Sequence, residues 1–490
     1  MTSRRFTIAV AILAVSLAAN VRAGDNFRLH GTPIYDWHHG CSPTAGIMAL
    51  QYWNAWGFDL VPEGPGAWRE ASASQGHIAD YSLFGGVQDD DGDTPYNDMS
   101  TLNPGGAHPN NCLADFMKTS FSALGLTYGS TRTTNIPIGM ARYAAWRGVD
   151  FSAHRFTTSL IDTIERELLL GRPVLLSTDT DGDGVTDHSV TAVAYNEDNG
   201  YPEVLVHDTW GGTTSIRIQS PSAGTEWGVG GAVAFWPTGT GDSIADASGR
   251  WGHGSTWSGR TPDERMMTAI RPGATVTVSG PASAYSLTNY GALGVNADLA
   301  AGRLLQNAGQ TTTRAGRLQA DRILQMYCGG NSPLPPPTSY FLQKGGTVET
   351  ESLTVTATGP SGSDDVDSVY RFEQGRLDVI GTIRVSSRGR FNWFGGTLHA
   401  GEIAVEGSIG LGLPTDLGAV ADGSAFGGTL TKAGPNARLF VTNDATVTVE
   451  RDARLSMPLT VGREGMDGRG FISMSEPVTL EVDDLAIENG

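Results

Sequence analysis

The chain has 490 residues, with 33 basic and 52 acidic side chains and a formal net charge of −19. This acidic balance argues against a nucleic-acid partner and against an anionic membrane surface, because both bind basic proteins. Glycine accounts for 65 residues but follows no Gly-X-Y period, which excludes a collagen-like chain. The length is sufficient for at least two domains, each with a core of its own.

The N-terminus has the three parts of a secretory signal peptide. Arg4 and Arg5 form a basic start, an apolar run extends over 7–19, and small residues precede a cleavage point after Ala23. The apolar run is shorter than the roughly 20 residues that a membrane span needs. We therefore expect residues 1–23 to be cleaved and the mature protein to be secreted, extracellular or periplasmic, with no transmembrane segment. The alternative is an uncleaved anchor.

Residues 24–272 combine helical and strand patterns and contain ten of the eleven tryptophans. Apolar residues at helical spacing predict helices over 42–56 and 159–170, and a further helix is expected near 112–124. Short β-branched runs then predict strands over 174–177, 190–195 and 204–208. Helices followed by a mostly antiparallel sheet are typical of an α+β domain.

Residues 273–490 change to short alternating strands that each follow a glycine turn. The phrase Gly-Gly-Thr-Val or Gly-Gly-Thr-Leu recurs at Gly345, Gly395 and Gly427. Units this small cannot bury a face of their own, so neighbouring units must stack. The pattern predicts an all-β region, read as a right-handed parallel β-solenoid, with a β-sandwich as the alternative.

Two segments depart from this pattern. A proline-rich stretch at 331–340 interrupts the series and is read either as a linker or as a long loop ejected from one rung. Residues 318–326 have the only helical spacing expected in this region.

The three cysteines, Cys41, Cys112 and Cys328, leave at least one thiol unpaired in a chain that we expect to be exported. Their wide separation excludes a disulfide scaffold and a cysteine zinc site. Cys41 stands at the start of the helix predicted over 42–56, where the helix dipole lowers the pKa of a thiol and favours the nucleophilic thiolate. Cys112 and Cys328 are interpreted as inert, or as a disulfide between domains.

A cysteine nucleophile needs a histidine to share its proton and an acceptor that orients the imidazole. His188 is the best candidate, because it begins a predicted strand and would project from the end of the sheet. Asp208 closes the next strand, and its carboxylate can accept a hydrogen bond from His188 if the two strands pair. His207 points to the opposite face of its strand from Asp208, so only one of them can serve the site.

Four phrases together resemble the papain-like cysteine peptidases. They are Gly-Cys-Ser-Pro-Thr at 40–44, Gly-Arg-Pro-Val at 171–174, Asp-His-Ser-Val at 187–190 and His-Asp-Thr-Trp-Gly at 207–211. The most similar group is the relatives of the bacteriocin-processing, double-glycine-leader peptidases, family 39 of the cysteine peptidases. The resemblance covers roughly residues 28–237.

This resemblance implies a role for each of four residues. Cys41 would be the nucleophile, His188 the general base and Asp208 the orienting acid. Trp210 matches a tryptophan that shields the His–acid pair in many papain-like enzymes.

The segment before Cys41 departs from the papain-like pattern. These peptidases usually place a glutamine about six residues before the cysteine to donate to the oxyanion, and residues 24–40 contain none. Tyr35 occupies that position, and its phenol could donate together with the Cys41 N–H; Trp37, His38 or His39 are the alternatives. One oxyanion donor is worth about 2.7–4 kcal/mol in the transition state, so without a replacement the domain would be slow or degenerate.

The loop before His188 carries a second motif. Its carboxylates alternate around glycine turns and belong to Asp179, Asp181, Asp183 and Asp187. The loop resembles the aspartate-rich calcium loops of thrombospondin-type and dockerin-type modules, although position twelve of an EF-hand would be Val190 instead of Glu. We expect either a calcium ion that braces the loop or a solvated hairpin tip; no cofactor is required.

The sequence thus predicts an exported cysteine peptidase that hydrolyses peptide bonds of a peptide or protein through a thioester acyl-enzyme. The solenoid would attach it to a cell surface or a polysaccharide. A transglutaminase or amidase with the same three residues is one alternative. An adhesion or binding protein with a degenerate papain-like domain is the other. The pairing of the two domains points to a bacterium.

Overall fold

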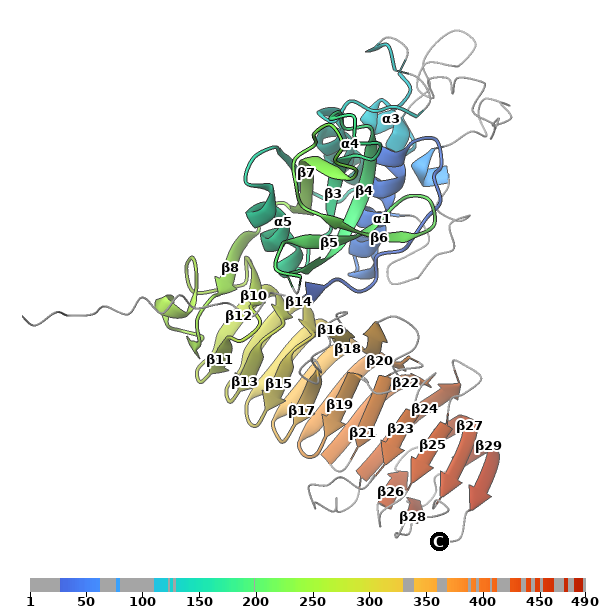
Figure 1. Ribbon diagram of the computed structural model, residues 1–490. Helices are drawn as coiled ribbons and strands as arrows, with labels where there is room; N and C mark the ends of the chain where they lie inside the picture. The colour runs from blue at the N-terminus through green and yellow to red at the C-terminus, as the bar shows by residue number, and fades with distance from the viewer. Residues whose placement is uncertain are drawn as a thin grey trace, which may run out of the picture.

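The computed structural model describes residues 27–61, 76–79, 110–328 and 339–400, and the strand backbones between 401 and 487. Short gaps inside these ranges fall at 122–123, 127–128, 198, 359–367, 387–388 and 394–395. The expected signal peptide lies outside the described residues. Within them, no helix is long and apolar enough to cross a bilayer. Figure 1 shows a helix-containing N-terminal domain followed by a long array of strands.

The N-terminal domain is built around one antiparallel sheet. Its strands lie in the spatial order β2, β7, β3, β4, β5, β6, and β1 pairs with β4. They are β1 (Phe27–Arg28), β2 (Phe151–Phe156), β3 (Val174–Asp179), β4 (His188–Asn196), β5 (Glu203–His207), β6 (Thr213–Arg217) and β7 (Gly228–Pro237). The strands predicted in this part of the chain are confirmed as β3, β4 and β5.

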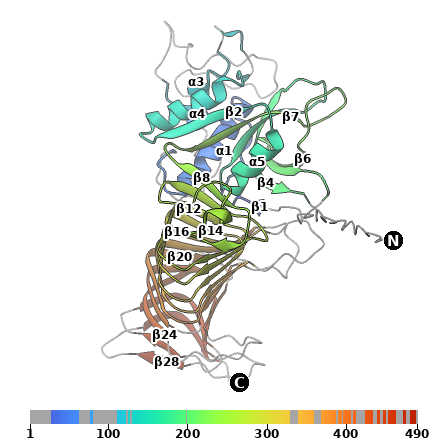
Figure 2. The same cartoon turned by 90° about the vertical axis from the view of Figure 1, so that its left-hand side faces the viewer.

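The helices with defined bounds in the described part of this domain are α1 (Cys41–Ala55), α3 (Leu113–Met117), α4 (Asn135–Trp146) and α5 (Leu160–Leu169). α1 packs against β3 and β4, α4 against β2 and β7, and α5 against β4 and β7 (Figure 2). α1 and α5 confirm the helices predicted over 42–56 and 159–170. The helix expected near 112–124 is much shorter, because Lys118 and Ser120 adopt left-handed backbone conformations with φ of 56° and 54°.

The two predicted helices begin and end for local reasons. Pro43 lies in the first turn of α1, where no intrahelical partner is lost by its missing N–H. α5 buries Ile164 and Leu168 on one face and ends at Leu169, two residues before Gly171, which has a φ of 79°. The Gly171 N–H donates to the Leu168 carbonyl at 3.0 Å, so the glycine closes the helix.

From β8 (Gly241–Ala245) onward, the strands form a parallel array. Along most of it each strand pairs in parallel with the strand two places along the chain, and β24 pairs with both β26 and β27. Successive layers stay in register: Ala292 pairs with Gln310, and Gln310 with Tyr340. The array therefore consists of two alternating series of strands that stack layer on layer (Figure 1).

The strands of the array are 2 to 12 residues long. The first half comprises β8, β9 (Gly249–Arg250), β10 (Met266–Ile270), β11 (Thr275–Val278), β12 (Ala282–Asn289), β13 (Ala292–Val295), β14 (Leu299–Asn307), β15 (Gln310–Thr313), β16 (Arg317–Cys328), β17 (Tyr340–Gln343) and β18 (Thr347–Thr358). The second half comprises β19 (Ser368–Phe372), β20 (Arg376–Val385), β21 (Gly389–Trp393), β22 (Gly396–Val405), β23 (Ser408–Leu411), β24 (Ser424–Lys432), β25 (Arg438–Val441), β26 (Thr446–Val449), β27 (Ala453–Val461), β28 (Phe471–Met474) and β29 (Leu480–Ile487). A 3-10 turn, Gly254–Thr256, follows β9.

The interior of the array is filled by like side chains from successive layers. Phe341 stacks on Tyr370 with ring centroids 4.6 Å apart, and Tyr370 stacks on Phe391 at 5.3 Å. Asn289 donates from Nδ2 to Asn307 Oδ1 at 2.7 Å. Parallel, in-register pairing places equivalent residues one above the other, so ladders of this kind repeat along the array.

Three sequence expectations about this region meet the structure differently. Residues 318–326 lie in β16 and not in a helix, because Leu318 pairs with strands on both sides and Ala320 is also buried. The parallel array begins at β8, earlier than the boundary expected at 272. The proline-rich stretch lies largely outside the described residues, but β16 and β17 on its two sides both belong to the array.

The domain and the first layers of the array share one apolar core. From the array it takes in Met267, Ala269, Tyr290 and Leu304, together with core residues of the domain. Tyr290 packs its ring against Phe27 of β1, with centroids 5.4 Å apart. The contact between the two parts is therefore apolar at its centre.

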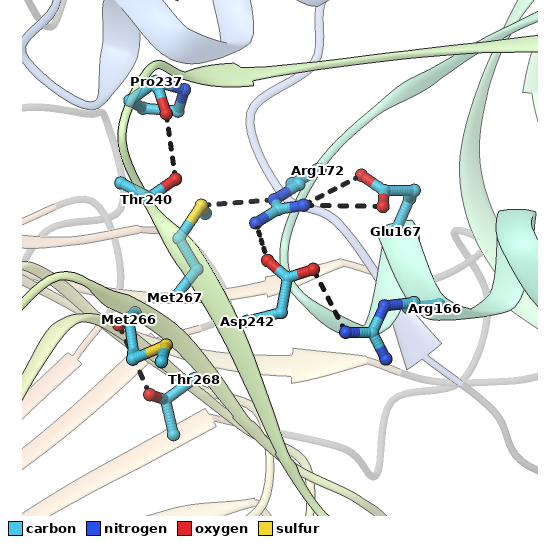
Figure 3. A network of polar contacts seen from close by, with 9 residues as sticks. All are labelled: Arg166, Glu167, Arg172, Pro237, Thr240, Asp242, Met266, Met267 and Thr268. Carbon is cyan, nitrogen blue, oxygen red and sulfur yellow. Dashed lines mark hydrogen bonds and ion pairs between the residues drawn. The ribbon is translucent and has the colours of Figure 1, made fainter. Parts of the chain in front are cut away.

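A buried ion-pair network crosses the same junction (Figure 3). Arg172, which follows α5, pairs with Glu167 at 3.2 Å and with Asp242 of β8. Asp242 also pairs with Arg166 at 3.1 Å, and Arg172 Nε lies 3.2 Å from the Met267 sulfur. Burial raises the pKa of Glu167, while the Arg172 charge opposes that rise. The guanidinium thus ties the domain to the first strand of the array.

Candidate active site

Cys41 is the first residue of α1, and a strained turn delivers it there. His39 has a φ of 52° and Gly40 a φ of 132°, so the backbone leaves the ordinary regions just before the helix. A Cβ at Gly40 would lie 2.6 Å from the Gly129 carbonyl oxygen, so only glycine fits. Thr44 donates its hydroxyl to the Gly40 carbonyl at 2.8 Å and fixes the turn. The thiol is held at the positive end of the helix.

His188 begins β4 and hydrogen-bonds the Cys41 thiol. The N–H and the hydroxyl of Ser189 also hydrogen-bond this sulfur. The Ser189 hydroxyl lies 2.9 Å from that of Ser42. Burial raises the pKa of the Cys41 thiol, but the hydrogen bond and charge of His188, with Ser189, outweigh it, and the pKa falls below its usual 9.0. The contacts favour the thiolate.

The imidazole of His188 shows the complementary shift. Burial lowers its pKa, but the hydrogen bond and charge of Cys41, a hydrogen bond to the Asp208 carbonyl and the charge of Asp187 together raise it above 6.5. A thiol with a lowered pKa beside an imidazole with a raised pKa can form a thiolate–imidazolium pair near neutral pH. Such a pair supplies both a nucleophile and a proton donor.

Asp208 contacts His188, but through a different atom from the one expected. The His188 Nε2 lies 2.9 Å from the main-chain oxygen of Asp208 and 3.1 Å from Thr209 Oγ1. The Asp208 carboxylate accepts instead from the N–H groups of Trp210, at 2.8 Å, and Gly212, at 3.0 Å. The predicted carboxylate–imidazole hydrogen bond is therefore wrong. The side chain caps its own turn, and the main-chain oxygen contacts the ring in its place.

Trp210 lies where the sequence resemblance expects a shielding ring. It stacks on His188 with centroids 4.2 Å apart and an interplanar angle of 15°. Trp227 meets Trp210 edge-on at 5.9 Å. Trp210 is nevertheless 53% exposed, so it covers one face of the imidazole and presents its other face to solvent.

The residues proposed for the oxyanion lie in the segment just before Cys41. Tyr35 is only 1% exposed and belongs to the domain core. His39 is fully buried, and burial followed by the charge of His38 lowers its pKa to about 3, which keeps its ring neutral. The pKa of His38 is lowered by burial as well. An oxyanion role for Tyr35, Trp37, His38 or His39 stays a prediction.

His207 is a core residue. It is 3% exposed, its Nδ1 lies 2.8 Å from the Pro33 carbonyl oxygen, and burial lowers its pKa to about 4. A carbonyl oxygen only accepts, so Nδ1 carries the proton of a neutral ring. Its role is to tie β5 to the segment that leads to α1.

The aspartate-rich loop brings three of its four carboxylates together. Oxygens of Asp179, Asp181 and Asp183 lie within 4.8 Å of one another. Asp187 turns away and accepts from the N–H and the hydroxyl of Thr180, at 2.9 and 2.8 Å. The Asp179 oxygens also accept main-chain N–H groups within the loop at 2.8 Å. The cluster therefore already has a structural role within the turn.

Three functional contacts were not predicted from the sequence. Ser189 and Ser42 lie beside the thiol, and Thr209 lies beside the imidazole. Ser189 and Thr209 directly follow residues that were predicted, and no spacing rule singles them out. Only the pairing of β4 with β5 and the packing of α1 on β4 bring them to the site.

The comparison with protein families agrees with this geometry. Residues 29–226 match the model of the Peptidase_C39 like family, which confirms the resemblance to the family 39 cysteine peptidases. The matched segment contains α1 with Cys41, β4 with His188 and the turn after β5. No curated protein and no solved structure matches the chain.

Proposed function

Because residues 29–226 form a Peptidase_C39-like segment, we propose that this protein is an exported cysteine peptidase with Cys41 as its nucleophile. The Cys41–His188 contact is the observation that carries the proposal. It combines a thiol at a helix start, whose pKa is lowered, with an imidazole whose pKa is raised. Perturbations of this kind are concentrated at reactive sites.

The proposed reaction proceeds in two halves. The Cys41 thiolate attacks the carbonyl carbon of the peptide bond, and the imidazolium of His188 gives its proton to the departing amine, which leaves a thioester. In the second half, His188 takes a proton from water and the hydroxide attacks the thioester. The carboxylic acid is released and Cys41 departs as the thiolate, which restores its pair with the His188 imidazolium. The Cys41 N–H at the helix start has no intrahelical acceptor and can bind the oxyanion, with Tyr35 as the proposed second donor.

Two other functions use the same residues differently. A transglutaminase or amidase would form the same thioester, from a side-chain amide or another amide, and pass the acyl group to an amine or water. A degenerate domain would keep the fold without the reaction, leaving adhesion or binding as the function. The thiolate–imidazolium pair favours an acyl-transfer enzyme over the degenerate reading, because a binding module has no need of an activated thiol.

For the array we propose a right-handed parallel β-solenoid that attaches the enzyme to a cell surface or polysaccharide. The pairing of each strand with the strand two places along supports a coiled chain over a sandwich, since sandwiches are antiparallel. Export, with cleavage after Ala23 in a bacterial cell, completes this proposal.

We also propose that Asp179, Asp181 and Asp183 bind calcium. Calcium takes six to eight oxygen ligands, to which the loop would contribute carboxylates and main-chain oxygens. At tenfold the dissociation constant, a bound ion adds about 1.4 kcal/mol to the free energy of unfolding. Calcium should therefore raise the melting temperature of wild-type protein but not of Asp181→Asn. A melting temperature indifferent to both calcium and chelator removes the ion from the proposal.

The peptidase proposal is tested by the alkylation of Cys41 as a function of pH. The full chain is treated briefly with iodoacetamide, and peptide mass spectrometry reports labelling at each cysteine. We expect Cys41 to react at a pH below the value at which the urea-unfolded chain begins to react, and Cys112, which is fully buried, to react slowly. A folded profile that coincides with the unfolded one would falsify the activated thiol.

A further inference from the structure

The turn after β5, residues 208–212, controls the far side of the imidazole. The main-chain oxygen of Asp208 can only accept, so Nε2 of His188 carries a proton whenever the 2.9 Å contact is made. The other ring nitrogen, Nδ1, is then the one left for the Cys41 thiol. The turn thereby fixes which nitrogen exchanges protons with the sulfur.

Thr209 stands out within this turn on two independent grounds. Its hydroxyl oxygen lies 3.1 Å from Nε2 of His188, and it is completely buried. Its φ is 65°, which a β-branched residue adopts at a cost of roughly 1–3 kcal/mol. That conformation directs both the preceding carbonyl and the Thr209 hydroxyl at the same ring nitrogen.

The surrounding contacts hold the strained turn in place. The Asp208 carboxylate accepts from Trp210 and Gly212, and the Asp208 N–H donates to the Gly212 carbonyl at 3.1 Å. Trp210 also forms an isolated β-bridge with Asp36, in the segment that leads to Cys41. The turn is thus joined to the nucleophile's own segment, and the carboxylate acts on the backbone and not on the ring.

We infer that Thr209 is a positioning residue for His188. Together with the Asp208 carbonyl, its hydroxyl does what the sequence resemblance assigns to the Asp208 carboxylate. This inference rests on the proposed function, because orienting the imidazole matters only if Cys41 reacts. Two neutral acceptors hold the Nε2–H and stabilise the imidazolium, so that Nδ1 remains the proton partner of the thiol.

The charged groups around the imidazole bear on its titration. They are Cys41 on α1, Asp187 directly before β4, and Asp208, whose carboxylate faces its own turn. Trp210 and Trp227 are neutral. Removing the Thr209 acceptor should destabilise the imidazolium and with it the thiolate. The onset of Cys41 alkylation then moves to higher pH.

The test compares the pH dependence of Cys41 alkylation in four full-length variants. Thr209→Val removes the hydroxyl with little change of shape, and we expect about a tenfold loss of alkylation at pH 6, a displacement of about one pH unit. Thr209→Ser should restore most of it. Thr240→Val, which removes a hydroxyl bonded to the Pro237 carbonyl, is the matched control.

Asp208→Asn separates the two ways of orienting the ring. It keeps an oxygen for the N–H groups of Trp210 and Gly212, so its effect should be smaller than that of Thr209→Val. If the carboxylate oriented the imidazole, Asp208→Asn would displace the alkylation profile to higher pH by more than Thr209→Val does. A profile unchanged in Thr209→Val, or displaced further by Asp208→Asn, overturns the inference.

A second measurement keeps the inference testable if Cys41 is unreactive or Thr209→Val folds poorly. In a Cys41→Ala background, NMR of histidine-labelled protein follows the titration of His188, assigned by comparison with His188→Gln. We expect Thr209→Ala and Thr209→Val to lower its pKa and Thr209→Ser to restore it. An unchanged titration contradicts the role of Thr209, whereas a slowly labelled wild-type Cys41 contradicts only the proposed peptidase.

Discussion

The residues with positive φ are of different types in the domain and in the array. Among the described residues, those other than glycine with positive φ all lie in the domain, at His39, Lys118, Ser120, Ser159, Thr209 and Trp227. In the described part of the array, the residues with positive φ are glycines, such as Gly316, Gly346, Gly375 and Gly396. Two of the strained residues in the domain, His39 and Thr209, flank the reactive pair. The domain thus uses strained non-glycine residues at some of its turns, two of them beside the reactive pair, whereas glycine occupies the repeated turns of the array.

The array's glycines form a column because each turn lies directly on the previous one. A Cβ at Gly375 would lie 2.3 Å from the Gly346 carbonyl oxygen, and one at Gly346 would lie 2.6 Å from that of Gly316. The same residue is therefore required in layer after layer. In the domain, by contrast, the reactive atoms come from segments far apart in the chain, and Ser42 and Ser189 are 147 residues apart.

The largest predicted effect is on the peptide cleavage that we propose for the domain. His188→Gln should reduce peptide cleavage roughly 10²- to 10⁴-fold, because it removes the general acid and base. His207→Gln is the matched control, since that buried histidine bonds to Pro33 and not to the thiol. Cleavage of a mixed peptide library, followed by mass spectrometry, measures both. Equal losses in the two variants would remove His188 from its assigned role.

The junction between the regions is the next target. Arg172→Met leaves Glu167 and Asp242 without their buried partner and should cost about 3–5 kcal/mol of unfolding free energy. Arg147→Met removes an exposed pair with Asp59 and should cost at most about 1 kcal/mol. Denaturant unfolding measures both changes. We also expect the wild type to unfold in one transition and Arg172→Met in two. Equal stabilities for Arg172→Met and Arg147→Met would contradict the role of Arg172 in joining the domain to the array.

A fall in pH should lower the unfolding free energy of the domain before that of the array. The folded-state pKa of His207 is about 4 because burial disfavours its charge, whereas in the unfolded chain it is 6.5. The unfolded chain therefore binds more protons between these values, and stability falls as the pH drops from 6.5 to 4, by about 3 kcal/mol from this group. Urea unfolding at pH 7 and pH 4.5 measures the loss. His207→Gln should reduce it, and an undiminished loss would count against this cause.

The smallest effect is expected inside the array. Asn307→Ala removes an acceptor of Asn289 and a donor to Gln325, and should cost about 1–3 kcal/mol. Asn296→Ala, at an exposed position, should be nearly neutral. Calorimetry of the two variants gives the difference. Because each layer contacts mainly its neighbours, neither change should affect the alkylation of Cys41. A variant that loses both array stability and Cys41 alkylation would show that the array influences the site in the domain.

Much of the fold followed from local patterns. The helix that begins at Cys41 and the helix that ends at Leu169 were predicted within two residues, because apolar spacing and turn residues are local signals. The strands β3, β4 and β5 were expected for the same reason. Residues 318–326 were misread as a helix, since pairing with two neighbouring strands overrode a weak periodicity.

The sequence by itself determined which residue types meet at the site: a cysteine at a helix start, a histidine at a strand start and an aspartate at the end of the next strand. Periodicity and turn chemistry are enough for that, because they act over a few residues. The tertiary structure alone decided which atoms meet. A left-handed turn at Thr209 rotates the Asp208 carboxylate toward its own backbone and presents a carbonyl and a hydroxyl to His188. Only the packing around that turn maintains its strained conformation, and no local pattern in the sequence records it.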